Sequence, residues 1–147
     1  MKLTKDTMYA WKALVYLAAH QGDGRVLGSA IAEAVCVSYG VITPILRLLK
    51  AAGLVDSTKV GWGGYRLVKK AADITLLDVV EAIRGPLHRP TAEESPQATA
   101  QGQRLRSAWD EAVEAMRCQL RKVRLADLMD QEQSVALRVE TNLRRGH

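Results

Sequence analysis

Apolar residues recur at helical spacing in three stretches of the first half of the chain. In residues 4–20 they fall on nearly every face of a helix, which Thr4 is placed to cap and a glycine-rich segment, residues 21–24, is placed to end. A helix that is apolar all round is covered on more than one side, so we expect this one at the centre of the fold. Two shorter amphipathic stretches follow, with Ser29 and Ser38 as their predicted N-caps.

These two amphipathic stretches are separated by a turn of only three or four residues, which is the spacing of a helix–turn–helix. Directly after them, the β-prone residues 54–58 and 65–68 flank a glycine-rich turn, which predicts a hairpin, or wing. Thr75 and Asp78 then match a capping pattern that opens a further helix. The predicted fold is mainly helical, with a winged helix–turn–helix domain over residues 1–85 and a small β-hairpin as its wing.

The second half of the chain changes character. Residues 86–103 are rich in proline, serine, threonine and glutamine and predict a polar loop. Residues 104–130 are expected to hold one long amphipathic helix and a short following helix, and residues 131–147 a charged tail that frays. A single apolar stripe on a long helix needs a partner surface, and a second copy of the chain would supply it. The predicted dimerisation residues are Leu105, Trp109, Ala112, Val113, Met116 and Leu120.

Composition narrows the possible partners. The net charge is +5, and residues 1–85 account for +4 of it, with 11 basic and 7 acidic side chains, which favours a polyanionic partner for this domain. Two cysteines, Cys36 and Cys118, are too few for a disulfide framework and lack metal-finger spacing. The longest apolar run, residues 13–19, is too short to cross a bilayer, and no secretory leader is recognisable. We expect a cytoplasmic protein with no membrane partner, and no motif predicts an enzyme.

The second helix of the helix–turn–helix and the wing supply the candidate contacts to double-stranded DNA. The major groove admits one helix, whose exposed polar side chains reach base edges, and a basic wing tip reaches the minor groove or a phosphate. The candidates are Ser38, Tyr39, Thr43 and Arg47 for base edges, Lys50 near the DNA backbone, and Lys59 at the wing tip. Trp62, also in the wing, either lies against the sugar-phosphate backbone or packs on the wing's own strands.

Two features of this region have alternative interpretations. Pro44 lies inside the predicted recognition helix, where it removes one backbone hydrogen bond and crowds the carbonyl of Gly40. Either the helix is single and bent, which the missing side chain of Gly40 favours, or Thr43 caps a separate helix that begins at Pro44. Cys36 falls in the turn, where a positive φ would favour glycine, and is either an oxidant sensor or, more simply, a small buried hydrophobe. Cys118, near the dimerisation stripe, is the second possible redox sensor.

Several segments, in order along the chain, resemble one family of bacterial regulators. They are the opening MKLTKDTMYAWKALVYLA, ILRLLKAAGLV at 45–55, the wing segment GWGGYRL at 61–67, ITLLDVVEAI at 74–83, then Trp109 and LADL at 125–128. Together they span about residues 1–130 and resemble the Rrf2 family of winged-helix regulators. The resemblance implies a homodimeric transcription factor, usually a repressor, which binds a palindromic operator and uses the long helix as its dimer contact.

One departure from the family concerns its iron–sulfur members, which place three cysteines and a further ligand in the loop before the long helix. Here residues 86–108 contain no cysteine and one histidine, His88, and the carboxylates Glu93 and Glu94 replace thiolates poorly. The chain therefore resembles a cluster-free member, and no cofactor is expected. The affinity for DNA would then be set by a partner protein or a small metabolite, as the cysteine-metabolism branch of the family allows. A more distant alternative is a winged-helix interaction adaptor that has lost DNA binding.

Overall fold

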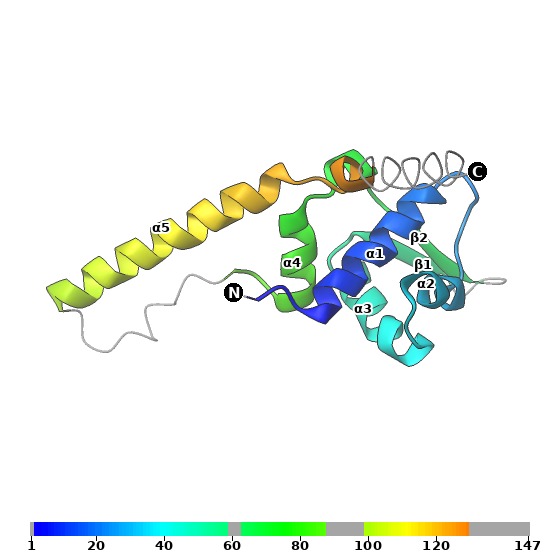
Figure 1. Cartoon of the computed structure of the whole chain (residues 1–147), viewed down its shortest axis with the longest axis horizontal. Helices are drawn as coiled ribbons and strands as arrows, with labels where there is room; N and C mark the ends of the chain where they lie inside the picture. The colour runs from blue at the N-terminus through cyan, green and yellow to red at the C-terminus, as the bar shows by residue number, and fades with distance from the viewer. Residues whose placement is uncertain (1, 59–62, 88–98, 130–147) are drawn as a thin grey trace, which may run out of the picture.

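The computed structural model describes residues 2–58, 63–87 and 99–129 and shows a helical domain from which one long helix projects (Figure 1). In chain order its elements are α1 (Lys5–Ala19), α2 (Gly28–Val35), α3 (Tyr39–Ala51), β1 (Val55–Thr58), β2 (Gly64–Leu67), a 3₁₀ turn η1 (Ala71–Asp73), α4 (Leu76–Arg84) and α5 (Ala100–Lys122). A further helical segment at 125–129 follows α5. The predicted mainly helical fold, with a hairpin wing and a long C-terminal helix, is confirmed.

The first helix, α1, lies at the centre of the core. Its residues Ala10, Ala13 and Leu17 are at most 2% exposed, and the helix packs against α2, α3, α4 and β2. The hydroxyl of Thr4 accepts a hydrogen bond from the N–H of Thr7 at 3.3 Å, as the predicted N-cap requires. The expectation that this helix is covered on more than one side is confirmed.

Helices α2 and α3 form the helix–turn–helix, with a bend of 110° between them. Cys36, in the turn, has φ 62° and ψ 45°, which is the left-handed conformation expected at this position. The predicted cap at Ser29 is wrong, because α2 begins at Gly28 with Leu27 as an N-cap that makes no side-chain hydrogen bond. The Leu27 carbonyl already accepts the first helical hydrogen bond, from the N–H of Ile31 at 3.1 Å, so Ser29 lies inside the helix. A Cβ on Gly28 would lie 2.9 Å from a ring carbon of Tyr39 on α3, a close contact that glycine avoids.

Strands β1 and β2 form the antiparallel hairpin that the sequence predicts for the wing. Val26, in the segment before α2, adds an isolated bridge to Tyr65 of β2 through backbone hydrogen bonds of 2.9 and 2.7 Å. The wing is therefore connected to both ends of the helix–turn–helix: β1 follows α3 in the chain, and β2 bonds to Val26 just before α2. Lys59 and Trp62 lie outside the described residues.

Capping decides where the last two helices begin. Thr75 and Asp78 form the predicted capping box at the start of α4. Helix α5 begins at Ala100, four residues earlier than the predicted start at 104, because the Thr99 hydroxyl accepts a hydrogen bond from the N–H of Gly102 at 3.1 Å. The polar segment between the two helices is correspondingly shorter.

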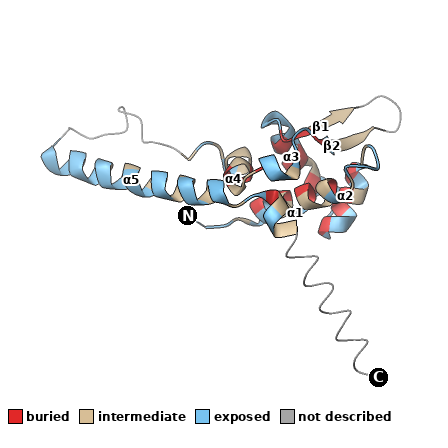
Figure 2. Cartoon of the chain, turned by 90° about the horizontal axis from the view of Figure 1, so that it is seen from above, coloured by how far each residue is buried: buried red, intermediate tan, exposed pale blue. Residues whose placement is uncertain are grey.

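Helix α5 extends away from the domain, and none of its residues is buried (Figure 2). Backbone hydrogen bonds of 2.8 Å attach the chain that follows it to the start of α4, from the N–H of Leu76 to the carbonyl of Val123 and from the N–H of Leu125 to the carbonyl of Ile74. Leu125 itself is fully buried. No single described helix is long and apolar enough to span a bilayer, and the α2–α3 pair reaches that length and hydropathy only jointly, across its bend.

Candidate nucleic-acid interface

Helix α3 has one buried face and one exposed face. The side chains that pack into the core are those of Ile42, Ile45, Leu46 and Leu49. Residues three and four apart share a face of a helix, so the exposed residues Gly40, Pro44 and Arg47 lie together on the opposite side. We call these three residues the outer face of α3.

Helix α3 runs without interruption through Pro44. The single-helix interpretation is therefore confirmed, and a separate helix capped by Thr43 is excluded. The hydroxyl of Thr43 instead donates to the carbonyl of Tyr39, one turn back, at 2.7 Å. Ser38 is the N-cap residue, as expected, but its hydroxyl makes no capping hydrogen bond. Of the three hydroxyl residues predicted to reach base edges, Ser38 thus precedes α3, Tyr39 begins it, and Thr43 already donates within the helix.

The flank of α3 that faces the wing carries the other predicted contacts. Lys50 Nζ donates to the Ser57 hydroxyl of β1 at 2.7 Å, which joins the end of α3 to the wing. Tyr39 is 55% exposed and lies beside Tyr65 of β2. Burial raises the pKa of the Tyr65 phenol, and the Tyr39 phenol adds to this, whereas the Arg47 cation opposes it. The structure therefore brings Tyr39, Arg47 and Lys50 together beside the base of the wing.

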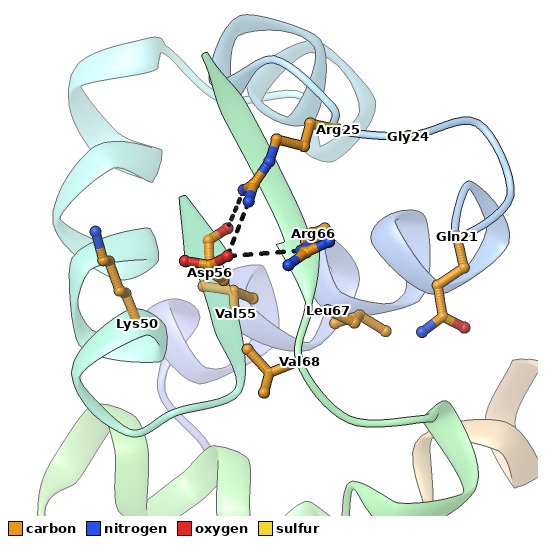
Figure 3. A pocket seen from close by; sticks show the side chains of 9 residues that line it. All are labelled: Gln21, Gly24, Arg25, Lys50, Val55, Asp56, Arg66, Leu67 and Val68. Atoms are coloured by element: carbon orange, nitrogen blue, oxygen red, sulfur yellow. Dashed lines mark hydrogen bonds and ion pairs between the residues drawn. The ribbon is translucent and has the colours of Figure 1, made fainter. Parts of the chain in front are cut away.

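A charge cluster at the base of the wing was not predicted from the sequence; Figure 3 shows the open cleft that it lines. Arg25, from the segment between α1 and α2, binds Asp56 Oδ2 through Nη2 at 2.9 Å, and Arg66 Nε lies 3.5 Å from the same oxygen. Arg25 Nη1 also donates to the backbone carbonyls of Asp56 and Gly64 at 3.4 and 3.5 Å. The hydrogen bond from Arg25 lowers the pKa of the Asp56 carboxyl. These contacts tie both strands of the wing to the segment that precedes α2.

A second unpredicted ion pair joins α5 to α4. Arg117 Nη1 of α5 binds Glu81 Oε1 of α4, and the two side chains are 25% and 27% exposed. The same oxygen accepts a hydrogen bond from the N–H of Leu87 at 3.3 Å. Arg117 Nε also lies 3.7 Å from the exposed carboxylate of Glu114. Glu81 thus links the winged domain, the chain that leaves α4, and the long helix.

The apolar stripe predicted for dimerisation lies along α5. Leu105 and Trp109 are 72% and 57% exposed, and the other four residues of the stripe are exposed or half-buried. Cys118, on the same helix, and Cys36 are both exposed free thiols. The interpretation of Cys36 as a small buried hydrophobe is wrong, because the residue lies in a turn at the surface and not on the buried face of α2.

Known proteins share this sequence and fold. The family model of Rrf2, described as an iron-dependent transcriptional regulator, matches residues 3–131. The protein rrf2 of Nitratidesulfovibrio vulgaris is 36% identical over 132 residues, which cover 88% of this chain and 87% of that protein. The chain belongs to the Rrf2 family. It is a member of a family of transcriptional regulators and not of a family of enzymes.

Solved structures of Rrf2-type regulators agree with this assignment. CymR, the global cysteine regulator of B. subtilis, matches with a TM-score of 0.69 and 25% identity over 89% of this chain and 98% of that one. The oxidized form of Staphylococcus aureus CymR matches with a TM-score of 0.63 and 27% identity over 88% of this chain and 96% of that one. T. potens IscR, at 24% identity, shares the fold with a TM-score of 0.67 over 92% of this chain and 90% of that one. The resemblance drawn from the sequence is confirmed.

The description of the Rrf2 family as iron-dependent requires a comparison with the ligands that this chain offers. Cysteine thiolates are the usual cluster ligands, and the chain has two cysteines, one in the α2–α3 turn and one on α5. Within residues 2–58, 63–87 and 99–129, no three His, Cys, Asp or Glu side chains are grouped so that they would hold a metal ion. His88, Glu93 and Glu94 lie outside these residues. In this described part of the chain, the two cysteines stand on different elements and belong to no group of donors that would hold a cluster.

Proposed function

We propose that this Rrf2-family protein is a cytoplasmic homodimer that binds a palindromic operator in double-stranded DNA and represses transcription. The observation that carries the proposal is the exposed outer face of α3. It lies beside a wing that is tied to α3 by Lys50 and to the preceding segment by Arg25. A fixed helix beside a fixed wing is the arrangement with which winged-helix regulators contact a major groove and the adjoining backbone.

The chemistry of each side chain indicates which part of the DNA it would contact. Ser38, Tyr39, Thr43 and Arg47 would meet base edges, which carry the sequence information. Lys50, Lys59 and Trp62 would meet the sugar-phosphate backbone, which supplies most of the affinity and fixes the register.

The homodimer is proposed from the long helix. An exposed tryptophan and leucine on one stripe, far from the core of their own chain, form an apolar surface of the kind that protein interfaces cover. A second copy offers the same stripe, and a twofold axis would place two α3 helices in successive major grooves, about 34–36 Å apart. The six residues Leu105, Trp109, Ala112, Val113, Met116 and Leu120 would form this contact.

The signal is proposed to act without an iron–sulfur cluster. Two cysteines, neither of them in residues 86–108, support this proposal, and a partner protein or a small metabolite is the proposed effector. Cys36 and Cys118 are both exposed to solvent and are therefore accessible to oxidants, so each stays a candidate redox sensor. In either case the effector would release DNA by changing the distance between the two α3 helices.

The test is fluorescence anisotropy of the full chain with a duplex selected from a random library, over a range of salt concentrations. We expect the logarithm of the association constant to fall linearly with the logarithm of salt, because each phosphate contact releases counterions. Lys59→Ala is expected to weaken binding to selected and to unrelated duplexes by a similar factor. Lys122→Ala, which removes one positive charge from α5, is the matched control. Absence of binding even at low salt would contradict DNA binding and favour the protein-interaction adaptor.

A further inference from the structure

The outer face of α3 is mostly apolar and has one charged residue. Of its three residues, only Arg47 has a hydrogen-bonding side chain, since Gly40 has none and the Pro44 ring consists of carbon atoms beyond its backbone nitrogen. Val41 and Leu48, on the flank away from the wing, are also apolar and are 43% and 42% exposed. The outer face of α3 therefore offers base edges one hydrogen-bonding side chain and otherwise carbon.

The hydrogen-bonding groups lie at the two ends of this surface. Ser38 precedes the helix, and its hydroxyl lies 4.0 Å from where a Cβ on Gly40 would stand. Arg47 lies nine residues further on, about 14 Å along the axis at about 1.5 Å per residue, which corresponds to about four base-pair steps of about 3.4 Å. Between them, Thr43 already donates its hydroxyl proton to the Tyr39 carbonyl, so towards a base its oxygen can only accept. On the outer face itself, Gly40 and Pro44 leave carbon as the surface between the two ends.

In the major groove, the base-edge group that matches an apolar side chain is the C5-methyl of thymine. The missing side chain of Gly40 allows such a methyl to approach the helix backbone, and Pro44 and Val41 supply the carbon surface beside it. A guanidinium at the end of the same face matches the O6 and N7 acceptors of guanine.

We propose that α3 recognises its half-site through thymine methyl groups packed on Pro44 and Val41, with Arg47 bound to a guanine at one end. The inference rests on the proposed function, because it specifies how the same helix would read the operator. To the base-edge contacts already proposed for Arg47 and for the hydroxyls of Ser38, Tyr39 and Thr43, it adds apolar contacts at the centre of the helix.

The experiment uses the full chain and a duplex selected from a random library. Each thymine of one half-site is replaced in turn by deoxyuridine, which removes the methyl group and keeps base pairing. We expect one or two positions at which the dissociation constant rises about fourfold, the effect of exposing one buried methyl-sized group. As a matched control, cytosines of the same half-site are replaced by 5-methylcytosine, which adds a methyl group to the major groove at positions that had none.

Two variants separate the apolar from the charged contact. Pro44→Ala is expected to bring the ratio of affinities for the thymine and deoxyuridine duplexes close to one, and Val41→Ala provides the same test without altering the backbone. Both side chains are exposed, so neither replacement removes core packing. Arg47→Ala is expected to keep the thymine-to-deoxyuridine ratio and to lose discrimination at the guanine.

The outcomes are distinguishable. Binding that is unchanged by every deoxyuridine replacement overturns the inference and leaves DNA binding intact. Selected half-sites without thymine overturn it as well. If no duplex is bound under any salt condition, the proposed function itself fails, and the inference fails with it.

Discussion

Replacing Glu81 is expected to loosen the attachment of the long helix to the winged domain. Glu81 and Arg117 are each about three-quarters buried, at 27% and 25% exposure, and a hydrogen bond between charged groups contributes about 1.5–3 kcal/mol. Partial exposure to solvent screens the pair, so Glu81→Ala should cost about 2 kcal/mol. Alanine is the best helix former, so α4 itself should not be weakened. At about 2–4 °C per kcal/mol for a chain of this size, the midpoint of unfolding should fall by about 4–8 °C.

The assay is thermal unfolding followed by circular dichroism at one fixed protomer concentration, because dimerisation shifts the midpoint. Glu114→Ala is the matched control, since this carboxylate is 65% exposed and contacts the same arginine at 3.7 Å and Arg121 at 3.2 Å. Exposed pairs of this kind contribute about 0.3–0.5 kcal/mol each, so the midpoint of the control should fall by about 1–4 °C, half the shift of Glu81→Ala or less. Equal shifts for the two variants would refute the argument that burial makes Glu81 the structural partner of Arg117.

Three further predictions concern the wing, the turn and the long helix. The lowered pKa of Asp56 means that its ion pairs stabilise the wing fully above the ordinary value of 3.8 and are lost as the pH falls through the folded value. The protection factors of the wing amides, which are corrected for the intrinsic exchange rate at each pH, should therefore decrease on acidification, and an equal decrease in Asp56→Asn would contradict this. Cys36→Gly should raise the free energy of unfolding by about 1 kcal/mol in urea titrations, because it relieves a left-handed backbone, whereas Cys118→Gly inside α5 should lower it by about 0.3–0.5 kcal/mol. A loss of stability in Cys36→Gly would count against the strain. Trp109→Ala should raise the dimer dissociation constant about 30-fold or more in sedimentation experiments, as expected for an aromatic hot spot, and Gln119→Ala should leave it unchanged. Unchanged dimerisation in both variants would show that the stripe is not part of the interface.

Local sequence signals account for the parts of the fold that were predicted correctly. Thr75 and Asp78 are three residues apart and cap each other, so α4 begins where the capping pattern places it. Pro44 and Gly40 are four residues apart, and the glycine removes the crowding that a proline ring imposes one turn back, so α3 stays single. In each case the residues that decide the structure lie within one helical turn.

The features that the sequence did not predict depend on residues far apart in the chain. Arg25 and Asp56 are 31 positions apart, and Glu81 and Arg117 are 36 apart, so no periodicity connects them. The wrong cap at Ser29 has a local origin instead, because the Leu27 carbonyl accepts the first hydrogen bond of α2 and Ser29 therefore lies inside the helix. One further contact could have been predicted: Asp56 and Arg66 lie directly opposite each other in the hairpin, so assigning its register would have indicated a cross-strand ion pair.

The dependence of affinity on half-site spacing tests the central claim most directly. Five base pairs inserted at the centre of the selected operator turn one half-site to the opposite face of the duplex, since one helical turn takes about 10–10.5 base pairs. A dimer that holds two α3 helices at a fixed distance should lose its tight binding to this duplex and keep only salt-sensitive, sequence-independent binding. Equal affinity for both duplexes would show that the two half-sites are read independently and would contradict the account.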